Sequence, residues 1–305
     1  MTPLSPPHSS PHAARGPIQH EFIAIDEGLA NLLHIDERDP SRNWIVPIGR
    51  SQARDMQLVG DGRVLIGHDN GYTEFDIHTG RVLRELATHA GVTSVRRLPD
   101  GRTLIAGVNL AGTEGVVVLE VNVHDVVQRQ TRFPGNYIRL VRETAAGTWL
   151  MMNDTMIREG DRTGTILHEW TVPRFRHAWK AVRLPNGHTL ASAGYGAFMV
   201  ELDAQGAVAR RFAAQASMPP AVNANFYAMF QLLPNGHIVL ANWQQHGPGH
   251  GHEGVQLLEL DENAAIVWQW SEADKISSLQ GVLVLDGLDT ARLHDERLGV
   301  MTPLD

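Results

Sequence analysis

The sequence predicts an all-β fold, a six-bladed β-propeller built from four-stranded blades. Five segments repeat one pattern of apolar runs, and each is anchored by a turn with glycine at position 62, 101, 147, 187 or 236. These glycines lie 39 to 49 residues apart, which is the spacing typical of propeller blades. No segment keeps a helical period, so we expect almost no helix.

Each repeat contains four short runs that alternate like strands. Residues 177–213 contain the runs HAWKAVRL, HTLASAG, AFMVELD and AVARRF. Pro-Asn-Gly separates the first two runs and predicts a tight turn, because proline presets its own φ and glycine accepts a positive φ.

The two ends of the chain complete a sixth blade. Residues 21–36 match the second and third strands of a repeat, and residues 43–48 supply a fourth. Residues 279–285 supply only a first strand. We expect this C-terminal strand to pair with the N-terminal strands, which closes the ring and removes open strand edges. Seven blades would need strands within 289–301, where the sequence suggests none.

The expected organisation is a flexible tail at 1–19, one propeller domain at 20–288 and a C-terminal extension at 289–305. Residues 1–16 have no apolar stretch of a secretory signal, so we expect a cytoplasmic protein. No apolar run approaches the roughly 20 residues of a membrane span. The pattern leaves the oligomeric state open.

Composition excludes several classes of function. The chain of 305 residues has no cysteine, which excludes disulfides, zinc thiolate sites and a cysteine nucleophile. Its net charge of −8 argues against nucleic-acid binding, because that affinity needs clustered Lys and Arg.

Particular phrases carry a family resemblance. LPNGHTL at 184–190 with VELD at 200–203, and ANW at 241–243 with LELD at 258–261, resemble the PQQ-like and arylsulfotransferase-like β-propellers. The resemblance spans about residues 20–288 and implies the propeller fold. The tandem tryptophan spacing of quinoprotein dehydrogenases is absent, so we do not expect bound PQQ.

The resemblance also implies where a site would lie. First strands line a central channel, and one face carries both the segments that lead into the blades and the loops between second and third strands. We call it the top face, and we expect the ligand site there. One of these loops, residues 243–254 (WQQHGPGHGHEG), is long and glycine-rich, as functional insertions often are. His250 and His252 are candidate ligands of a divalent metal, with a solvated loop as the alternative.

Further candidates lie at the starts of blades and on the loops between second and third strands. His177, His246 and Tyr227 are the catalytic candidates, since imidazole titrates near neutral pH. Cations in this set would give an acidic chain a pocket for a carboxylate, sulfate or phosphate, unless they pair with Asp55 and Asp154 instead. The candidates for substrate binding are Arg54, Arg139, Trp179, Lys180, Tyr195, Asn225, Trp243 and Gln280.

These residues predict an enzyme that acts on a small polar or anionic molecule, of the lyase or hydrolase type, with a divalent metal as a candidate cofactor. The first alternative is a non-catalytic propeller that binds a ligand or a protein. The second is a sulfuryl transferase, which the resemblance implies. Glycan recognition is a weaker reading, because the repeats do not share one polar and aromatic set.

Overall fold

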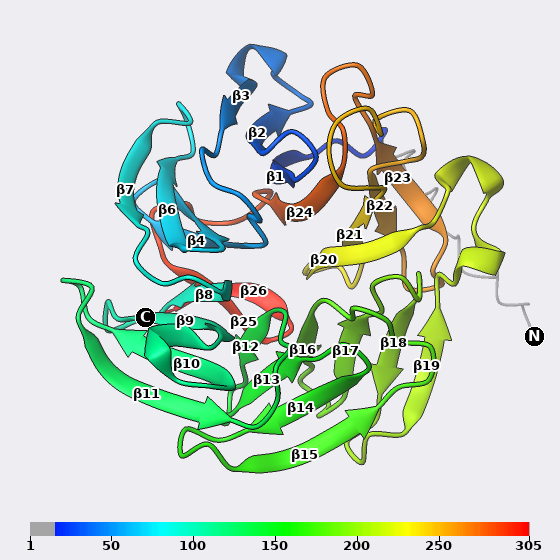
Figure 1. The fold of residues 1–305 in the computed structure, drawn as a ribbon. Helices are drawn as coiled ribbons and strands as arrows, with labels where there is room; N and C mark the ends of the chain where they lie inside the picture. Colours follow the sequence, from blue (N-terminus) through cyan, green and yellow to red (C-terminus); the bar gives the residue numbers. More distant parts are fainter. Residues whose placement is uncertain (1–15, 305) are drawn as a thin grey trace, which may run out of the picture.

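The computed structural model describes residues 16–304, and they form a ring of six four-stranded antiparallel blades (Figure 1). The predicted fold class is therefore confirmed. The predicted tail lies mostly outside the described residues. Within residues 16–304 the only helical segments are four short 3-10 turns, at Pro40–Arg42, Leu110–Gly112, Gln215–Ser217 and Pro220–Val222.

In every blade the strands follow one another from the innermost to the outermost. Blade 1 is β24 (Leu279–Val284), β1 (Glu21–Asp26), β2 (Asn31–Asp36) and β3 (Trp44–Pro47). Blade 2 is β4 (Asp55–Gly60), β5 (Arg63–His68), β6 (Gly71–Asp76) and β7 (Val82–Leu86). Blade 3 is β8 (Val92–Arg97), β9 (Thr103–Val108), β10 (Val116–Val121) and β11 (Val127–Phe133).

The other three blades have the same arrangement. Blade 4 is β12 (Val141–Glu143), β13 (Trp149–Met152), β14 (Met156–Gly160) and β15 (Ile166–Thr171). Blade 5 is β16 (Ala181–Arg183), β17 (Thr189–Ser192), β18 (Met199–Leu202) and β19 (Val208–Phe212). Blade 6 is β20 (Phe226–Leu232), β21 (Ile238–Trp243), β22 (Leu257–Leu260) and β23 (Ile266–Trp270).

Local chemistry explains the repeated turns. Gly101, Gly187 and Gly236 have φ of +82°, +85° and +86°, a region that favours glycine. At the turn before the outermost strand, an aspartate caps the backbone: the carboxylate of Asp203 accepts from the N–H groups of Gln205 and Ala207. The recurring frame of the repeat thus consists of two turns at the same end of each blade, one between the first and second strands and one between the third and fourth.

Neighbouring blades are joined by ion pairs as well as by apolar packing. A glutamate near the end of a third strand reaches an arginine of the next blade. Three such pairs are Glu74 with Arg97 at 2.7 Å, Glu120 with Arg162 at 2.7 Å and Glu159 with Arg183 at 2.5 Å.

The ring closes as predicted. β24 pairs antiparallel with β1, so that Phe22 faces Val284 and Ala24 faces Val282. The C-terminal strand therefore becomes the innermost strand of a blade whose other strands come from the N-terminus.

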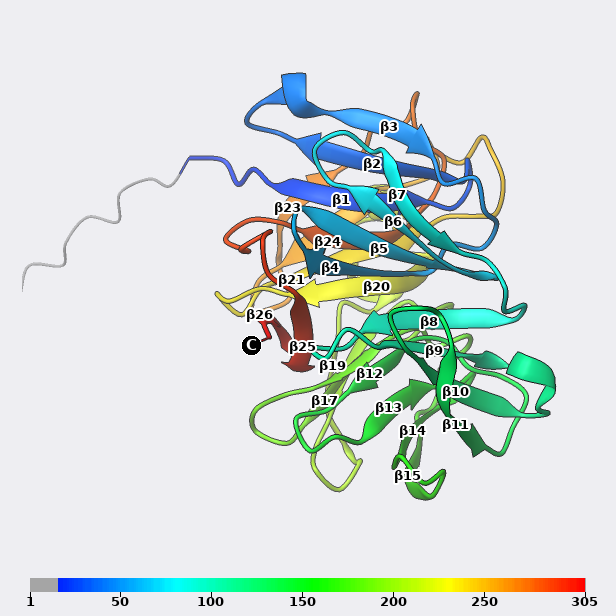
Figure 2. The same cartoon turned by 90° about the vertical axis from the view of Figure 1, so that its left-hand side faces the viewer.

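The C-terminal extension contains two strands that the sequence analysis did not predict, β25 (His294–Leu298) and β26 (Val300–Pro303). They form no seventh blade. This C-terminal hairpin lies near the centre of the ring (Figures 1 and 2), where β25 contacts β4, β12 and β16. The prediction failed because β25 buries His294, Asp295 and Glu296 rather than apolar residues, so its sequence lacks the apolar alternation of a strand.

No helix formed by residues 16–304 is long and apolar enough to cross a membrane.

Candidate functional site

A cavity of about 150 Å³ opens at the top end of the central channel. Its side chains come from the two kinds of segment expected on the top face, the starts of innermost strands and the loops between second and third strands. They are Glu27, Arg54, Arg139, His177, Trp179, Tyr195, Phe226, Trp243, His246 and Gln280. Five of the six blades contribute, and blade 3 does not.

Two arginines from blades 2 and 4 form a cationic side of the cavity. Within residues 16–304, neither Arg54 nor Arg139 forms an ion pair with a carboxylate. Burial, reinforced by the positive charge of Arg139, lowers the pKa of Arg54 to about 10, and burial also lowers the pKa of Arg139. Nε of Arg139 is buried without a hydrogen-bond partner among the described residues. Uncompensated guanidinium groups at a cavity favour an anionic ligand.

His177 is held in one orientation beside these arginines. Its backbone has φ of +54°, which is uncommon for a residue other than glycine, and its N–H donates to the carboxylate of Asp154 at 2.6 Å. The hydroxyl of Tyr137 lies 2.7 Å from Nδ1, and a guanidinium N–H of Arg139 lies 3.4 Å from the same atom.

These contacts assign the tautomer of His177. Because Arg139 can only donate, Nδ1 is the acceptor, and Nε2 carries the proton. Burial lowers the pKa of His177, the charges of Arg139 and Arg176 lower it further, and Asp154 opposes them in part. His177 therefore presents a neutral N–H donor near neutral pH, as a polarising histidine requires.

Glu27 and His246 form a carboxylate–imidazole pair at the rim. Nδ1 of His246 lies 2.8 Å from Oε1 of Glu27, and Nε1 of Trp243 donates to Oε2 of Glu27 at 3.0 Å. The indole of Trp243 also packs edge-on against His246, with ring centroids 4.5 Å apart. With Nδ1–H donating to the carboxylate, Nε2 of His246 carries the lone pair. This is the orientation of a general base.

Aromatic rings from blades 5 and 6 form another side of the cavity, which meets the cationic side where Arg139 lies over Trp179. Phe226 packs edge-to-face against Trp179, Tyr195 and Trp243, with ring centroids 5.5, 4.7 and 5.3 Å apart. Such contacts are favourable beyond the area that they bury, so the rings form a continuous wall.

The structure brings eight of the predicted site residues together in this cavity: Arg54, Arg139, His177, Trp179, Tyr195, Trp243, His246 and Gln280. It places the other predicted residues elsewhere. Asn225 donates to the backbone oxygen of Gln244 and so fixes the start of the long loop.

Tyr227 packs among apolar side chains of blades 5 and 6 and is fully buried. Burial raises its pKa well above the ordinary range. Successive strand residues point to opposite faces, and its neighbour Phe226 is the one that lines the cavity.

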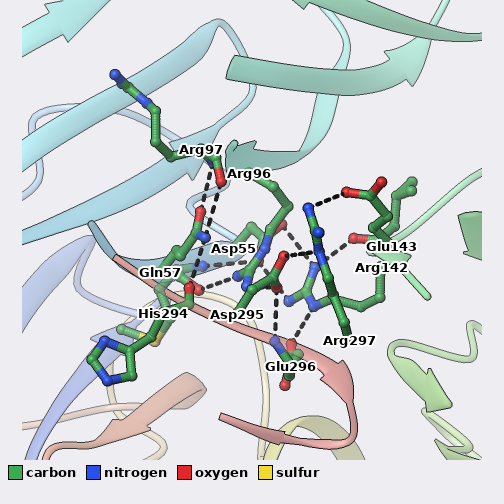
Figure 3. A network of polar contacts seen from close by, with 12 residues as sticks. Asp55, Gln57, Arg96, Arg97, Arg142, Glu143, His294, Asp295, Glu296 and Arg297 are labelled. Atoms are coloured by element: carbon green, nitrogen blue, oxygen red, sulfur yellow. Dashed lines mark hydrogen bonds and ion pairs between the residues drawn. The ribbon is translucent and has the colours of Figure 1, made fainter. Parts of the chain in front are cut away.

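Lys180 lies below the cavity, where it joins a set of charges that we call the axial network: Asp55, Arg96, Arg142, Lys180, Asp295 and Glu296. Figure 3 shows this network and labels each of these residues except Lys180. Nζ of Lys180 donates to Glu296 at 2.6 Å, and Arg142 contacts both Glu296 and Asp55. Burial lowers the pKa of Lys180 to about 8. Its charge is used inside the protein and does not face the cavity.

His250 and His252 lie apart from the cavity, and each contacts a different carboxylate. Nδ1 of His250 is 2.8 Å from Glu253, and Nε2 of His252 is 3.0 Å from Asp274. Across residues 16–304 no group of three or more His, Cys, Asp or Glu side chains is arranged to hold a metal ion. The geometry thus gives these two histidines surface ion pairs.

Sequence reasoning missed Glu27 and Phe226 as cavity residues and the Tyr137 contact to His177. Glu27 lies in a minimal loop, and only its place between a second and a third strand could have indicated it. Phe226 is one apolar residue at the start of a strand, with no polar signal.

No family model matches the chain, and no curated protein sequence matches it. Solved structures do. A protein of unknown function from Bacteroides caccae has a TM-score of 0.72 and 23% identity, over 87% of this chain and 98% of that chain. The similarity confirms the propeller-level resemblance that the repeats predicted.

Lyases occur among the other structures of similar fold. A catalytically inactive histidine-to-alanine variant of virginiamycin B lyase from Staphylococcus aureus, with quinupristin, has a TM-score of 0.56 and 11% identity over 91% of this chain and 87% of that chain. A streptogramin B lyase has a TM-score of 0.55 and 10% identity over 87% of this chain and 93% of that chain. At this identity the likeness concerns the fold alone.

Proposed function

We propose that this propeller is a lyase that eliminates a leaving group from a small carboxylate in the top-face cavity. One observation carries the proposal. A histidine oriented by a carboxylate, His246 on Glu27, lines the same cavity as two arginines that have no carboxylate partner among the described residues.

His246 is the general base. Glu27 holds its Nδ1–H at 2.8 Å and leaves Nε2 free to accept a proton. Trp243 fixes the other oxygen of Glu27 at 3.0 Å, so the carboxylate cannot turn away. The side chain of His246 is 69% exposed, and a bound ligand would cover it.

Arg54 and Arg139 would stabilise the negative charge that develops during the reaction. When a proton leaves the carbon next to a carboxylate, negative charge builds on the carboxylate oxygens. Arg54 and Arg139 would stabilise that charge, because they are already in place and their charges are not spent on a carboxylate of the described chain. Nε2–H of His177 adds a neutral donor beside them.

Elimination breaks two bonds of the substrate and forms one double bond. The proton passes to Nε2 of His246, and the C–H electron pair forms a carbon–carbon double bond. The leaving group on the next carbon departs with the electron pair of its own bond. It accepts a hydrogen bond from His177 and takes its proton from solvent.

Elimination fits the cavity better than hydrolysis through a covalent intermediate. Its lining contains no Ser, Thr, Cys or Lys side chain among the described residues, so covalent nucleophiles of these types are not at hand. The carboxylate of Glu27 is already held by His246 and Trp243. Two solved structures of similar fold are those of a virginiamycin B lyase and a streptogramin B lyase, which supports the same reaction class.

Deuterium exchange tests the proposal on a panel of acids, so the substrate need not be identified first. Carboxylic acids that carry a hydroxy, acyloxy or amino group on the β-carbon would be incubated with the protein in D2O and followed by NMR. We expect deuterium at the α-carbon and an alkene product for at least one acid. His246→Ala and Glu27→Gln should each lower the rate about 100-fold, the usual contribution of a general base.

His250→Ala is the matched control, because His250 lies on the same loop but contacts Glu253. Its rate should stay within about twofold of the wild type. If acids bind and neither exchange nor elimination occurs, the second candidate applies, a propeller that binds without catalysis. The exposed position of His246 favours that alternative.

A further inference from the structure

The cavity has three chemically different sides, each from different blades. Blades 2 and 4 supply Arg54 and Arg139, and blades 5 and 6 supply the aromatic wall. Blade 1 supplies Glu27 and Gln280. Because the blades follow one another around a ring, Arg54 of blade 2 lies across the channel from blade 5, whereas Arg139 of blade 4 lies next to blade 5, over Trp179.

Unpartnered polar atoms show what a ligand must provide. The side chain of Gln280 is 4% exposed and its Oε1 has no hydrogen-bond partner within residues 16–304. Trp179 is 2% exposed, and its Nε1 likewise lacks an acceptor there. Nε of Arg139 also has none in the same part of the chain. Buried polar atoms without partners are costly. All three side chains line the cavity, so a ligand or its waters that reached these atoms would relieve that cost.

The donors and the acceptors among these atoms lie in different parts of the cavity. Arg139 lies over the indole of Trp179, 5.4 Å from the ring centroid, so the two unpartnered donors are near each other and call for an acceptor such as a carboxylate. Gln280 and Glu27 are acceptors and call for an O–H or N–H donor. The wall of Phe226, Tyr195 and Trp243 calls for a flat apolar face.

We infer that the ligand is a small aromatic carboxylate that also carries a hydroxyl or amino donor. This inference rests on the cavity being the active site proposed above, and it narrows the substrate class of that site. The carboxylate binds Arg54, Arg139 and Trp179, the ring packs against Phe226 and Tyr195, and the donor reaches Gln280.

Four related probes test each feature in turn by isothermal titration calorimetry. 4-Hydroxyphenylacetate has all three features. Phenylacetate lacks the donor, 4-hydroxyphenethyl alcohol lacks the carboxylate, and 4-hydroxycyclohexylacetate lacks the flat ring. We expect 4-hydroxyphenylacetate to bind most tightly. Loss of the carboxylate should raise Kd about tenfold or more, since hydrogen bonds to charged groups are the strong ones.

Variants then assign each feature to its side of the cavity. Gln280→Met should bind 4-hydroxyphenylacetate and phenylacetate equally, and Arg139→Gln should no longer prefer the acid over the alcohol. Each variant is first checked for an unchanged circular dichroism spectrum. If either variant is misfolded, Tyr195→Leu, a partly exposed position, takes its place and should lose the preference for the flat ring.

Three results would overturn the inference: equal binding of all four probes, no binding of 4-hydroxyphenylacetate at millimolar concentration, or wild-type preferences retained in the variants. Tighter binding of phenyl phosphate than of 4-hydroxyphenylacetate would do so as well. Failure of the lyase proposal is distinguishable. If the protein discriminates among the probes but no acid exchanges deuterium in D2O, the lyase proposal is refuted and the inferred ligand class stands. If only non-aromatic acids are turned over, the lyase proposal stands and the inferred ligand class is refuted.

Discussion

Two groups of cations lie one below the other along the axis of the ring. The upper group is half-buried and the lower group is fully buried, and the two differ in their partners. In the cavity, Arg54 and Arg139 have no carboxylate partner within the described chain. In the axial network, three cations meet three carboxylates, two of which come from the C-terminal hairpin (Figure 3).

The difference teaches how a buried cation becomes available to a ligand. Arg54 and Asp55 are neighbours in the chain, yet one lines the cavity and the other binds Arg142 at 2.8 Å. The inner strands carry similar charges at both levels. The difference comes from the C-terminal hairpin, which brings the carboxylates of Asp295 and Glu296 to the axial network and brings no carboxylate to the cavity. Arg54 and Arg139 are therefore desolvated without a compensating carboxylate, and they remain able to bind an anion.

The largest expected effect is a loss of stability from a substitution in the axial network. Glu296→Gln removes the carboxylate that Arg142 and Lys180 share and leaves both charges buried. Removal of one partner from a buried ion pair costs about 3 to 5 kcal/mol. We therefore expect the free energy of unfolding in urea to fall by about that amount.

Glu272→Gln is the matched control, because Glu272 pairs with Lys275 at the exposed surface. It should change stability by less than about 1 kcal/mol.

The dependence of stability on pH provides a second test of the role of Glu296. Burial raises the pKa of Glu296, but three neighbouring cations outweigh burial and hold this pKa at about 2, below its ordinary 4.5. Stability from this group is present above pH 4.5 and is lost as the pH falls toward 2, a dependence that Glu296→Gln should lack.

A smaller effect should distinguish the cations of the cavity from those of the axial network. Arg139→Gln removes a cation that has no carboxylate to leave behind, so stability should stay within about 1 kcal/mol of the wild type or rise. Affinity for a carboxylate ligand should fall about tenfold or more. Arg142→Gln should do the opposite, with a large loss of stability. Equal destabilisation by both substitutions would contradict the comparison.

The smallest effect concerns the charge that Arg139 places on His177. Burial and the charges of Arg139 and Arg176 hold the pKa of His177 below its ordinary 6.5, so the ring should be neutral at pH 7. In Arg139→Gln one of these charges is gone, and the pKa should rise. NMR titration of the imidazole resonances measures this shift directly. An unchanged titration would show that Arg139 does not act on His177.

Much of the fold followed from the sequence, because turns such as Pro185-Asn186-Gly187 recur at the blade period and impose strong local constraints. The top-face location of Arg54, Arg139 and His177 followed from their places in that repeat together with the geometry that the propeller resemblance implies. The direction of a single side chain did not. Trp179 and Lys180 are adjacent, but one lines the cavity and the other enters the axial network.

The hairpin escaped prediction for a related reason. Asp295 and Glu296 are buried only because Arg96, Arg142 and Lys180 provide partners on three different blades. Carboxylates in a short C-terminal segment normally indicate solvent exposure. Only the assembled ring supplies the cations that reverse that expectation, so no local pattern could have revealed it.

The pairing of β24 with β1 has a consequence for how the protein is made. β1 emerges first from the ribosome, and its inner partner is translated only after the other five blades. At about 5 to 20 residues per second, that delay is on the order of 10 to 50 seconds. Throughout this time β1 has an open edge, and the newborn chain is exposed to pairing with a second copy until its own last blade strand arrives.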